Sequence, residues 1–264
     1  MTDVTNTEAD PVGTESTEWW NELKSITLHV EGDRPPLAAP GASEQYLSAR
    51  KALAEAEIAL RDQVEAVAAQ RRTLPPGPVL PEYTLAEGPL ELSDDGPATP
   101  VRLAELFGEH DELIVYHLMF HPEDDQPCAM CAMWVDGLRG VARHLGRRAG
   151  LAVIAKAPLD KLCAYGRRRG WDGLRLVSAY DQPAFLADLG IEGSRGGLFP
   201  AFSVFSRADG QVRHVLTECA DFGDGSGRGM DLLSPVWNVL DLLPSGRGDW
   251  LPDNAYPVAT VPAR

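Results

Sequence analysis

The chain has 264 residues, of which 44% are hydrophobic, and this is enough for one sizeable domain with a core, or for one domain with appendages. Its 24 basic and 39 acidic residues give a formal net charge of −15, which argues against nucleic acid and anionic membranes as partners. No apolar run approaches the ~20 residues that a membrane-spanning helix needs. The acidic, polar N-terminus has no signal-peptide pattern, so we expect a cytoplasmic protein.

The N-terminal part of the chain differs in composition from the rest. Residues 1–42 are acidic and end in a proline-rich stretch, which is typical of a loosely ordered tail. Residues 43–74 contain no Gly or Pro and are rich in Ala, Leu, Glu and Arg, so they predict a helix with Ser43 as its N-cap. An apolar stripe on this helix favours packing on its own domain or in a homodimer. We therefore expect a tail at 1–42, a helical arm and Pro-rich linker at 43–84, and one main domain at 85–264.

The main domain shows short apolar strands that alternate with helices, as in an α/β fold. Strands are predicted at 113–120, 150–155 and 174–178, and helices at 131–145, 159–169 and 183–189. The pair Asp209-Gly210 predicts a hairpin between strands 202–205 and 212–217, and a last helix is expected at 230–242. This order is the layout of a thioredoxin-like domain, which has a central mixed sheet flanked by helices.

A Cys-x-x-Cys pair lies where the first central strand passes into its helix. Cys128 and Cys131 are three residues apart, so their sulfur atoms are expected within bonding distance at the N-terminus of the helix. The unpaired N–H groups there favour a thiolate on Cys128, which makes it a nucleophile and Cys131 the resolving thiol. Pro200 precedes the hairpin, in the position of the usually cis proline that lies against the disulfide of thioredoxin-like proteins.

Several segments resemble one family throughout residues 43–250. They are ARKALAEAE, LIVYHLMF, CAMCAMWVDGL, AVIAKAPLDKLCAYGRRRGW, FSVFSRADGQVRHV and RGMDLLSPVWNVLDLLP. The chain thus resembles a bacterial thioredoxin-like family of unknown function, described as predicted dithiol–disulfide oxidoreductases. The resemblance implies the fold and a thiol chemistry, without a substrate.

Two local features favour a metal site instead. Glu123, Asp124 and Asp125 precede the cysteine pair, and carboxylates near the sulfur disfavour a thiolate and favour a cation. His117 and His121 lie on one side of the predicted strand, which ends near the cysteines. His117, His121, Cys128 and Cys131 together form a donor set that suits copper and, less well, zinc. The alternative for His117 is a satisfied core histidine, and for His121 a surface loop residue.

The remaining motifs are interpreted mainly as structural. Cys163 and Cys219 fall on apolar faces and are expected to be packing residues. The Gly-rich stretch 223–229 lacks the ending of a phosphate-binding loop and is interpreted as a lid or connection, from which Arg228 reaches the site if the loop folds over it.

We therefore expect a dithiol–disulfide oxidoreductase that needs no cofactor and acts on a thiol, a disulfide or another small molecule. Cys128 would be the nucleophile and Cys131 the resolving thiol, with Pro200 shaping the groove and His117 assisting proton transfer. The first alternative is a copper-dependent oxidase or oxygenase of specialised metabolism that uses the Cys/His set. The second is a non-catalytic metal carrier or binding module.

Overall fold

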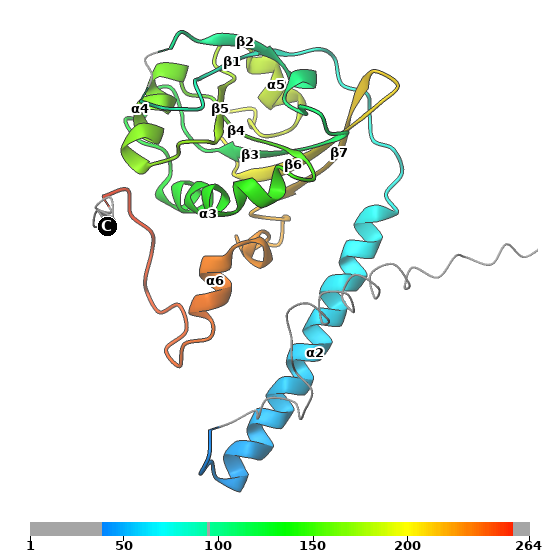
Figure 1. Ribbon diagram of the computed structural model, residues 1–264, viewed down its shortest axis with the longest axis vertical. Coiled ribbons are helices and arrows are strands. Elements are labelled where there is room, and N and C mark those ends of the chain that lie inside the picture. Colours follow the sequence, from blue (N-terminus) through cyan, green and yellow to red (C-terminus); the bar gives the residue numbers. More distant parts are fainter. Residues whose placement is uncertain (1–38, 94–95, 256–264) are drawn as a thin grey trace, which may run out of the picture. The chain divides into compact units, whose positions relative to one another are not determined.

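The computed structural model describes residues 39–93 and 96–255 (Figure 1). Nearly all of the predicted acidic tail, residues 1–38, lies outside the described residues. Contacts divide the chain into two compact units, Met1–Thr73 and Leu74–Arg264. We describe the two units separately, and the cysteine pair belongs to the second.

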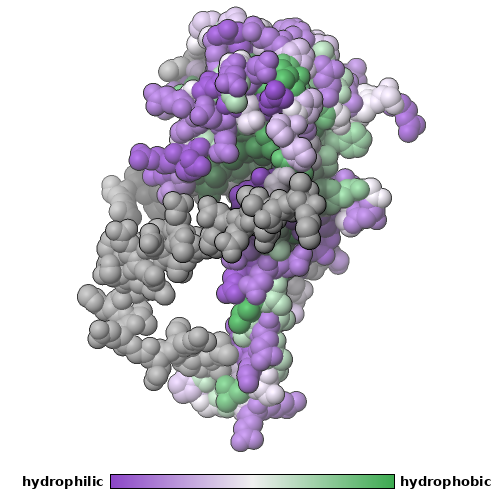
Figure 2. All heavy atoms as spheres, turned by 90° about the vertical axis from the view of Figure 1, so that its right-hand side faces the viewer, coloured by the Kyte–Doolittle hydropathy of each residue, from purple (hydrophilic) through white to green (hydrophobic). Residues whose placement is uncertain are grey.

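The first unit contains the predicted helix as α2, Glu44–Arg72. The side chain of Ser43 accepts a hydrogen bond from the backbone N–H of Tyr46 at 3.2 Å, as expected of an N-cap. No residue of α2 is buried, and Figure 2 shows apolar side chains scattered among hydrophilic ones along this helix. Among the described residues, no helix is long and apolar enough to cross a bilayer.

The second unit is built on one seven-stranded sheet with the order β2-β1-β5-β4-β3-β6-β7. Its three central strands, β3 to β5, are parallel, whereas β6 runs antiparallel to β3 and pairs with β7. The strands are β1 (Thr84–Glu87), β2 (Thr99–Arg102), β3 (Glu112–Leu118), β4 (Gly150–Ala155), β5 (Arg175–Ser178), β6 (Ala201–Ala208) and β7 (Gln211–Cys219).

The helices of this unit follow one another in the predicted order, and the first two of them connect the parallel strands (Figure 1). They are α3 (Ala129–Leu145), α4 (Leu159–Arg169), α5 (Pro183–Asp188) and α6 (Pro235–Leu240), with single 3-10 turns η1 (Leu103–Glu105) and η2 (Asp231–Leu233). The helix that we expected at 230–242 is divided into η2 and α6. Pro235 is the reason, because proline is accepted in the first turn of a helix but interrupts an interior turn.

The sequence did not predict the hairpin of β1 and β2 at the sheet edge. β2 contains Pro100, which an edge strand tolerates because its N–H side need not bond to a neighbour. The predicted hairpin of β6 and β7 is confirmed. Asp209 and Gly210 at its tip have φ values of 53° and 74°, as a two-residue hairpin turn requires.

Side chains alternate between two apolar layers, one on each face of the sheet. In β3, Tyr116 and Leu118 pack into the layer that holds α3, whereas Leu113 and Val115 pack into the layer that holds α5. The strand–helix–strand–helix–strand order, followed by an antiparallel pair and a last helix, defines a thioredoxin-like α/β fold. The predicted fold class is thus confirmed.

Candidate functional site

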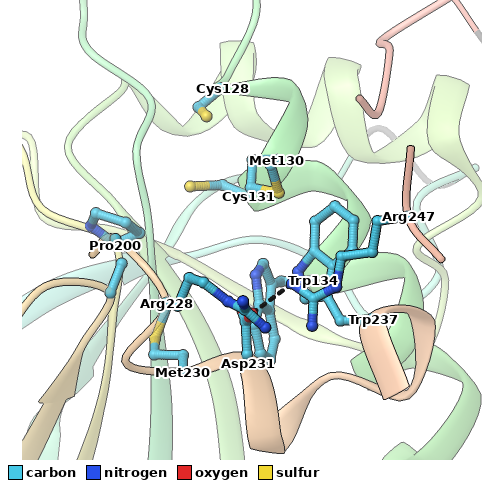
Figure 3. A pocket seen from close by; sticks show the side chains of 12 residues that line it. Cys128, Met130, Cys131, Trp134, Pro200, Arg228, Met230, Asp231, Trp237 and Arg247 are labelled. Atoms are coloured by element: carbon cyan, nitrogen blue, oxygen red, sulfur yellow. Dashed lines mark hydrogen bonds and ion pairs between the residues drawn. The ribbon is translucent and has the colours of Figure 1, made fainter. Parts of the chain in front are cut away.

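The cysteine pair opens into a cavity of about 250 Å³ (Figure 3). Three parts of the second unit supply its wall: the start of α3, the adjoining ends of β6 and β7, and the segment that follows β7. The lining residues are Cys128, Met130, Cys131, Trp134, Pro200, Ala220, Gly227, Arg228, Met230, Asp231, Trp237 and Arg247.

Cys128 is the N-cap of α3. Its backbone is not yet helical, with φ −53° and ψ 126°, while its carbonyl already accepts the first helical hydrogen bond, from the N–H of Ala132 at 2.9 Å. Its own N–H donates to the carbonyl of Met119 at 2.9 Å, which joins the helix start to the end of β3. Cys128 is partly exposed, and Cys131 is buried one turn deeper.

This position stabilises a thiolate on Cys128. The pKa of Cys128 is lowered from 9.0 to about 6, first of all by a hydrogen bond that the Cys131 side chain donates to its sulfur. The backbone N–H groups of Cys131 and Met130 lower the pKa further, whereas partial burial opposes them. Because the pKa lies below neutral pH, Cys128 is a nucleophile at pH 7.

The three carboxylates before the pair do not counteract this effect. Glu123, Asp124 and Asp125 are not among the groups that shift the pKa of Cys128. Instead, Lys161 of α4 donates to the backbone carbonyls of Pro122 and Asp124, both at 2.7 Å, and holds this loop against the domain.

Cys131 is the protonated partner of the pair. Its hydrogen bond to Cys128, its burial and the negative charge of Cys128 raise the pKa of Cys131 well above 9.0. The fully buried Tyr116 hydroxyl lies beside it and lowers this pKa in part. Among the described residues, the Tyr116 hydroxyl makes no hydrogen bond in this structure, in which Cys131 is a thiol. The hydroxyl can therefore donate a hydrogen bond to the sulfur of Cys131 when that thiol loses its proton.

His117 is not beside the cysteines. It follows Tyr116 in β3, so its side chain points to the opposite face of the sheet, where it lies 6.0 Å from the Phe185 ring between centroids. Its Nε2 and Ser203 Oγ form a hydrogen bond of 2.8 Å, and burial, then the charge of His214, lower the pKa of His117 to about 3. The side chain of β3 that lies beside Cys131 is therefore that of Tyr116 and not that of His117.

The four expected metal ligands are also not brought together. His121 lies in the loop after β3, where its Nδ1 accepts a hydrogen bond from the N–H of Glu123 at 3.3 Å, and it does not line the cavity. Within residues 39–93 and 96–255, no three His, Cys, Asp or Glu side chains are grouped as metal ligands. His117 and His121 were paired by strand alternation, but β3 ends at Leu118, so the alternation does not extend to His121.

Pro200 lies across the cavity from the cysteines, as the sequence predicts (Figure 3). The expected cis geometry is not observed, because no described peptide bond is cis. The carbonyl of Pro200 accepts a hydrogen bond from the N–H of Ala220 at 3.4 Å, and both residues line the cavity.

The cysteine loop is fixed from behind by the end of the described chain. Asn254 donates from Nδ2 to the carbonyl of Pro127 at 2.8 Å and accepts from the Tyr165 hydroxyl at 2.7 Å. Arg169 of α4 forms an ion pair with Asp136 of α3 at 2.8 Å. The basic last turn of α4 thus contributes a structural ion pair between two helices.

The other two cysteines lie in the apolar layers, as expected. Cys163 is buried in the layer of α3 and α4, and partly buried Cys219 packs against the other layer. Neither lines the cavity. Burial raises the pKa of both thiols, so they are less reactive than Cys128 at neutral pH.

Several residues of the site were not predicted from the sequence. Tyr116 was detectable, because strand alternation places it opposite to His117, but the face covered by α3 was not known. Met230, Trp237 and Arg247 come from the irregular segment after β7, and no spacing rule relates this segment to a cysteine pair about 100 residues earlier.

The chain belongs to a family described as bacterial protein of unknown function (DUF899), whose model matches residues 37–258. A comparison with curated proteins found no match. Among solved structures, the chain is similar to a reduced 2-Cys peroxiredoxin of Plasmodium vivax, with 14% identity, 60% of this chain and 77% of that chain covered, and a TM-score of 0.42. It is also similar to Enterococcus faecalis AhpC, with 15% identity, 60% and 87% covered, and a TM-score of 0.42.

We predict that Cys131→Ala raises the pKa of Cys128, because it removes the thiol whose hydrogen bond lowers that pKa most. Cys131→Ser keeps a donor and should keep the low value. The measurement is the rate of Cys128 alkylation by iodoacetamide against pH, read from the modified peptide, with a wild-type midpoint at about 6. A Cys131→Ala midpoint equal to that of the wild type would contradict this account.

We predict that His117 makes the fold sensitive to acid. A histidine with an ordinary pKa of 6.5 in the unfolded chain and about 3 in the folded chain binds its proton first in the unfolded state. The free energy of unfolding therefore falls as the pH drops from 6.5 towards 3. Between pH 7 and pH 5 the loss from this group is about 2 kcal/mol.

The test is urea unfolding at both pH values. His117→Gln, which keeps a polar side chain towards Ser203 without titrating, should show a smaller loss of stability than the wild type. His144→Gln, at an exposed histidine of α3, is the control and should keep the full loss. Equal losses in the wild type and His117→Gln would show that His117 does not set the acid response.

Proposed function

We propose that this protein is a thioredoxin-fold dithiol–disulfide oxidoreductase that uses Cys128 and Cys131. One observation carries the proposal: a partly exposed Cys128, whose pKa is lowered to about 6, lies directly over the buried thiol that donates to it, inside a cavity. A nucleophile, a resolving thiol and a space for the substrate are the three parts that thiol–disulfide exchange requires.

The first step is attack by the Cys128 thiolate on one sulfur atom of a substrate disulfide. A bond forms between Cys128 and that sulfur, the substrate S–S bond breaks, and the other sulfur leaves as a thiolate that takes a proton from water. The product is a mixed disulfide on Cys128. The helix N-terminus and the Cys131 thiol favour the ionised form of Cys128 and so provide the nucleophile.

The second step is attack by Cys131 on the sulfur of Cys128. Cys131 first loses its proton, and this is easier once Cys128 is in a mixed disulfide, because the Cys128 charge that raises the pKa of Cys131 is then gone. The Tyr116 hydroxyl donates to the new thiolate. A Cys128–Cys131 bond forms, the bond between Cys128 and the substrate sulfur breaks, and that sulfur leaves as a thiolate. This thiolate takes a proton from water, which balances the proton that Cys131 released to water, so the protein gives up two electrons and the substrate gains two.

The oxidised pair returns to the dithiol by the reverse exchange with a reducing dithiol. Stabilisation of the Cys128 thiolate favours the reduced protein, and a pair with this property is a comparatively strong oxidant among dithiol proteins. A weak reductant is therefore sufficient to regenerate it.

The copper-dependent and metal-carrier alternatives have less support. The copper site was expected to include His117 and His121, but His117 lies on the other face of the sheet and His121 does not line the cavity, so a metal held there loses these ligands. Dithiol exchange needs only the residues that the cavity brings together. A cytoplasmic location and a homodimer through α2 stay predictions.

The reduced protein should release two equivalents of pyridinethione from 4,4′-dipyridyl disulfide in a fast phase, one from each exchange step. Cys131→Ser should release one equivalent and retain a pyridylthio group in a mixed disulfide with Cys128. Cys128→Ser should lose the fast phase. The slow reaction of Cys163 and Cys219 is measured in the double variant Cys128→Ser/Cys131→Ser and subtracted. A wild-type fast phase that persists in Cys128→Ser would contradict the proposed function.

Tyr116→Phe should slow the second step, because the Cys131 thiolate then loses a hydrogen-bond donor. Hydrogen bonds to charged groups contribute about 1.5–3 kcal/mol, so the mixed disulfide on Cys128 should persist at least about tenfold longer. Acid quenching followed by mass spectrometry measures this lifetime. Tyr83→Phe is the matched control, because it removes a buried hydroxyl on the opposite face, where Tyr83 donates to Asp188 at 2.6 Å. An unchanged lifetime in Tyr116→Phe would exclude this role.

A further inference from the structure

The wall of the cavity that faces the cysteines comes from the segment after β7 (Figure 3). This segment supplies two arginines, Arg228 and Arg247, together with Asp231, Met230 and Trp237. The proposed exchange reaction uses none of these side chains, although they enclose the space in front of Cys128. The charge and the apolar surface of these side chains therefore indicate which class of substrate the cavity binds.

Two carboxylates fix Arg247 in the wall. Its Nε and Nη2 donate to the two oxygens of Asp241 at 2.8 and 2.7 Å, and its Nη1 donates to Asp231 Oδ2 at 2.5 Å. The guanidinium also lies over the Trp237 ring, 4.9 Å from the centroid. With each nitrogen of its guanidinium engaged, Arg247 serves to position Asp231 and is not itself available as the main contact for a ligand.

Asp231 in turn orients Arg228. The same Oδ2 atom accepts a hydrogen bond from Nε of Arg228 at 2.8 Å. In the described part of the chain, the terminal nitrogens of Arg228 have no partner, and 63% of its side chain is exposed. Arg228 therefore presents two N–H-bearing nitrogens at the cavity, a geometry that suits a carboxylate.

The backbone around Arg228 is closely packed. The N–H of Gly229 donates to the carbonyl of Ala220 at 2.7 Å, and a Cβ at Gly229 would collide with the carbonyl oxygen of Cys219. The Gly-rich loop thus meets the end of β7 at a point that only glycine allows. This contact fixes Arg228 at the cavity that Pro200 and Ala220 also line.

The rest of the wall is apolar. Met130, Trp134, Met230 and Trp237 line the cavity together with Cys128 and Arg228. A volume of about 250 Å³ lies below the ordinary range of pockets for drug-sized ligands, so the occupant is small. An occupant that uses the whole wall has a sulfur at Cys128, an apolar body against the aromatic side chains, and an anionic group at Arg228.

We infer that the substrate is a small disulfide that carries a carboxylate beside an apolar or aromatic body, and that Arg228 binds this carboxylate. The inference rests on the proposed function and names its substrate class. The exchange steps are unchanged: Cys128 attacks the sulfur, and Arg228 orients the disulfide from the other end. Because Arg228 is not among the groups that shift the pKa of Cys128, its role is in binding and not in activating the thiolate.

The test compares the reactions of two chromogenic disulfides at pH 7, followed by stopped-flow absorbance. One is bis(3-carboxy-4-nitrophenyl) disulfide, which is aromatic and carries two carboxylates, and the other is neutral 4,4′-dipyridyl disulfide. The measured quantity is the second-order rate constant of Cys128 with the dicarboxylate disulfide divided by that with the dipyridyl disulfide. This ratio is then divided by the same ratio for a small free thiol. A value well above one is expected for the wild type.

Arg228→Gln should lower this ratio about tenfold, the lower limit for a charge-assisted hydrogen bond at a partly exposed site. Arg228→Lys should restore part of the ratio, since it keeps the charge without the planar fork. Arg139→Gln removes an equal charge from the exposed side of α3 and should leave the ratio unchanged. The Cys128 alkylation profile of each variant checks that the thiolate is intact.

The outcomes separate the two claims. If the wild type reacts rapidly with the dipyridyl disulfide but Arg228→Gln keeps the wild-type ratio, the inference is wrong and the proposed function stands. A protein disulfide that reacts faster than both small disulfides, without dependence on Arg228, would also overturn the inference. If Cys128 reacts rapidly with neither disulfide, the proposed function itself fails.

Discussion

The hydrogen bond from Cys131 to Cys128 is the interaction on which the site depends. It makes the two thiols unequal, because the donor becomes harder to ionise and the acceptor easier. The helix N-terminus adds to this difference through the backbone N–H groups of Met130 and Cys131. Burial of Cys131 under a partly exposed Cys128 then fixes the order of events, since only Cys128 can meet a substrate first.

The sheet separates this chemistry from a second polar network. On the face opposite to the cysteines, hydrogen bonds of 2.8 Å connect His117 to Ser203, Ser203 to Thr217, and Thr217 to His214. Neighbouring residues of β3 thus lie in different surroundings: the Tyr116 hydroxyl lies beside the thiols, whereas the His117 ring packs in the layer of α5. A one-residue change of register in β3 would exchange the two side chains and place the histidine beside the cysteines.

The sequence was sufficient to predict the parts of the site that follow from local pattern. Cys128 and Cys131 are related by helical spacing, and Pro200 by its place before the hairpin, and the cavity brings all three together. Alternation holds within β3, where Tyr116 and Leu118 share a face, but it does not extend to His121 beyond the end of the strand. It did not predict which face α3 would cover, because this depends on packing between elements far apart in the chain, and so His117 was chosen in place of Tyr116.

The part of the cavity wall that follows β7 could not be predicted from local sequence pattern, for a further reason. Residues 223–247 contain glycines with positive φ, short turns and Pro235, so periodicity has little to detect. Their arrangement comes from side-chain contacts such as that of Asp231 with Arg247, 16 residues later. Arg228 was recognised as a residue that would reach the site if its loop folded over it, but its alignment by Asp231 and the close approach of Gly229 to β7 required the structure.

We propose that Cys128 and Cys131 cycle between a dithiol and one shared disulfide. The most direct measurement is peptide mass spectrometry after the protein has equilibrated in glutathione buffers of graded redox potential. The account predicts a reversible two-electron transition that yields a Cys128–Cys131 disulfide, with Cys163 and Cys219 still present as thiols. A pair that stays reduced across the whole range, or a Cys128 that forms its disulfide with another cysteine, would contradict it.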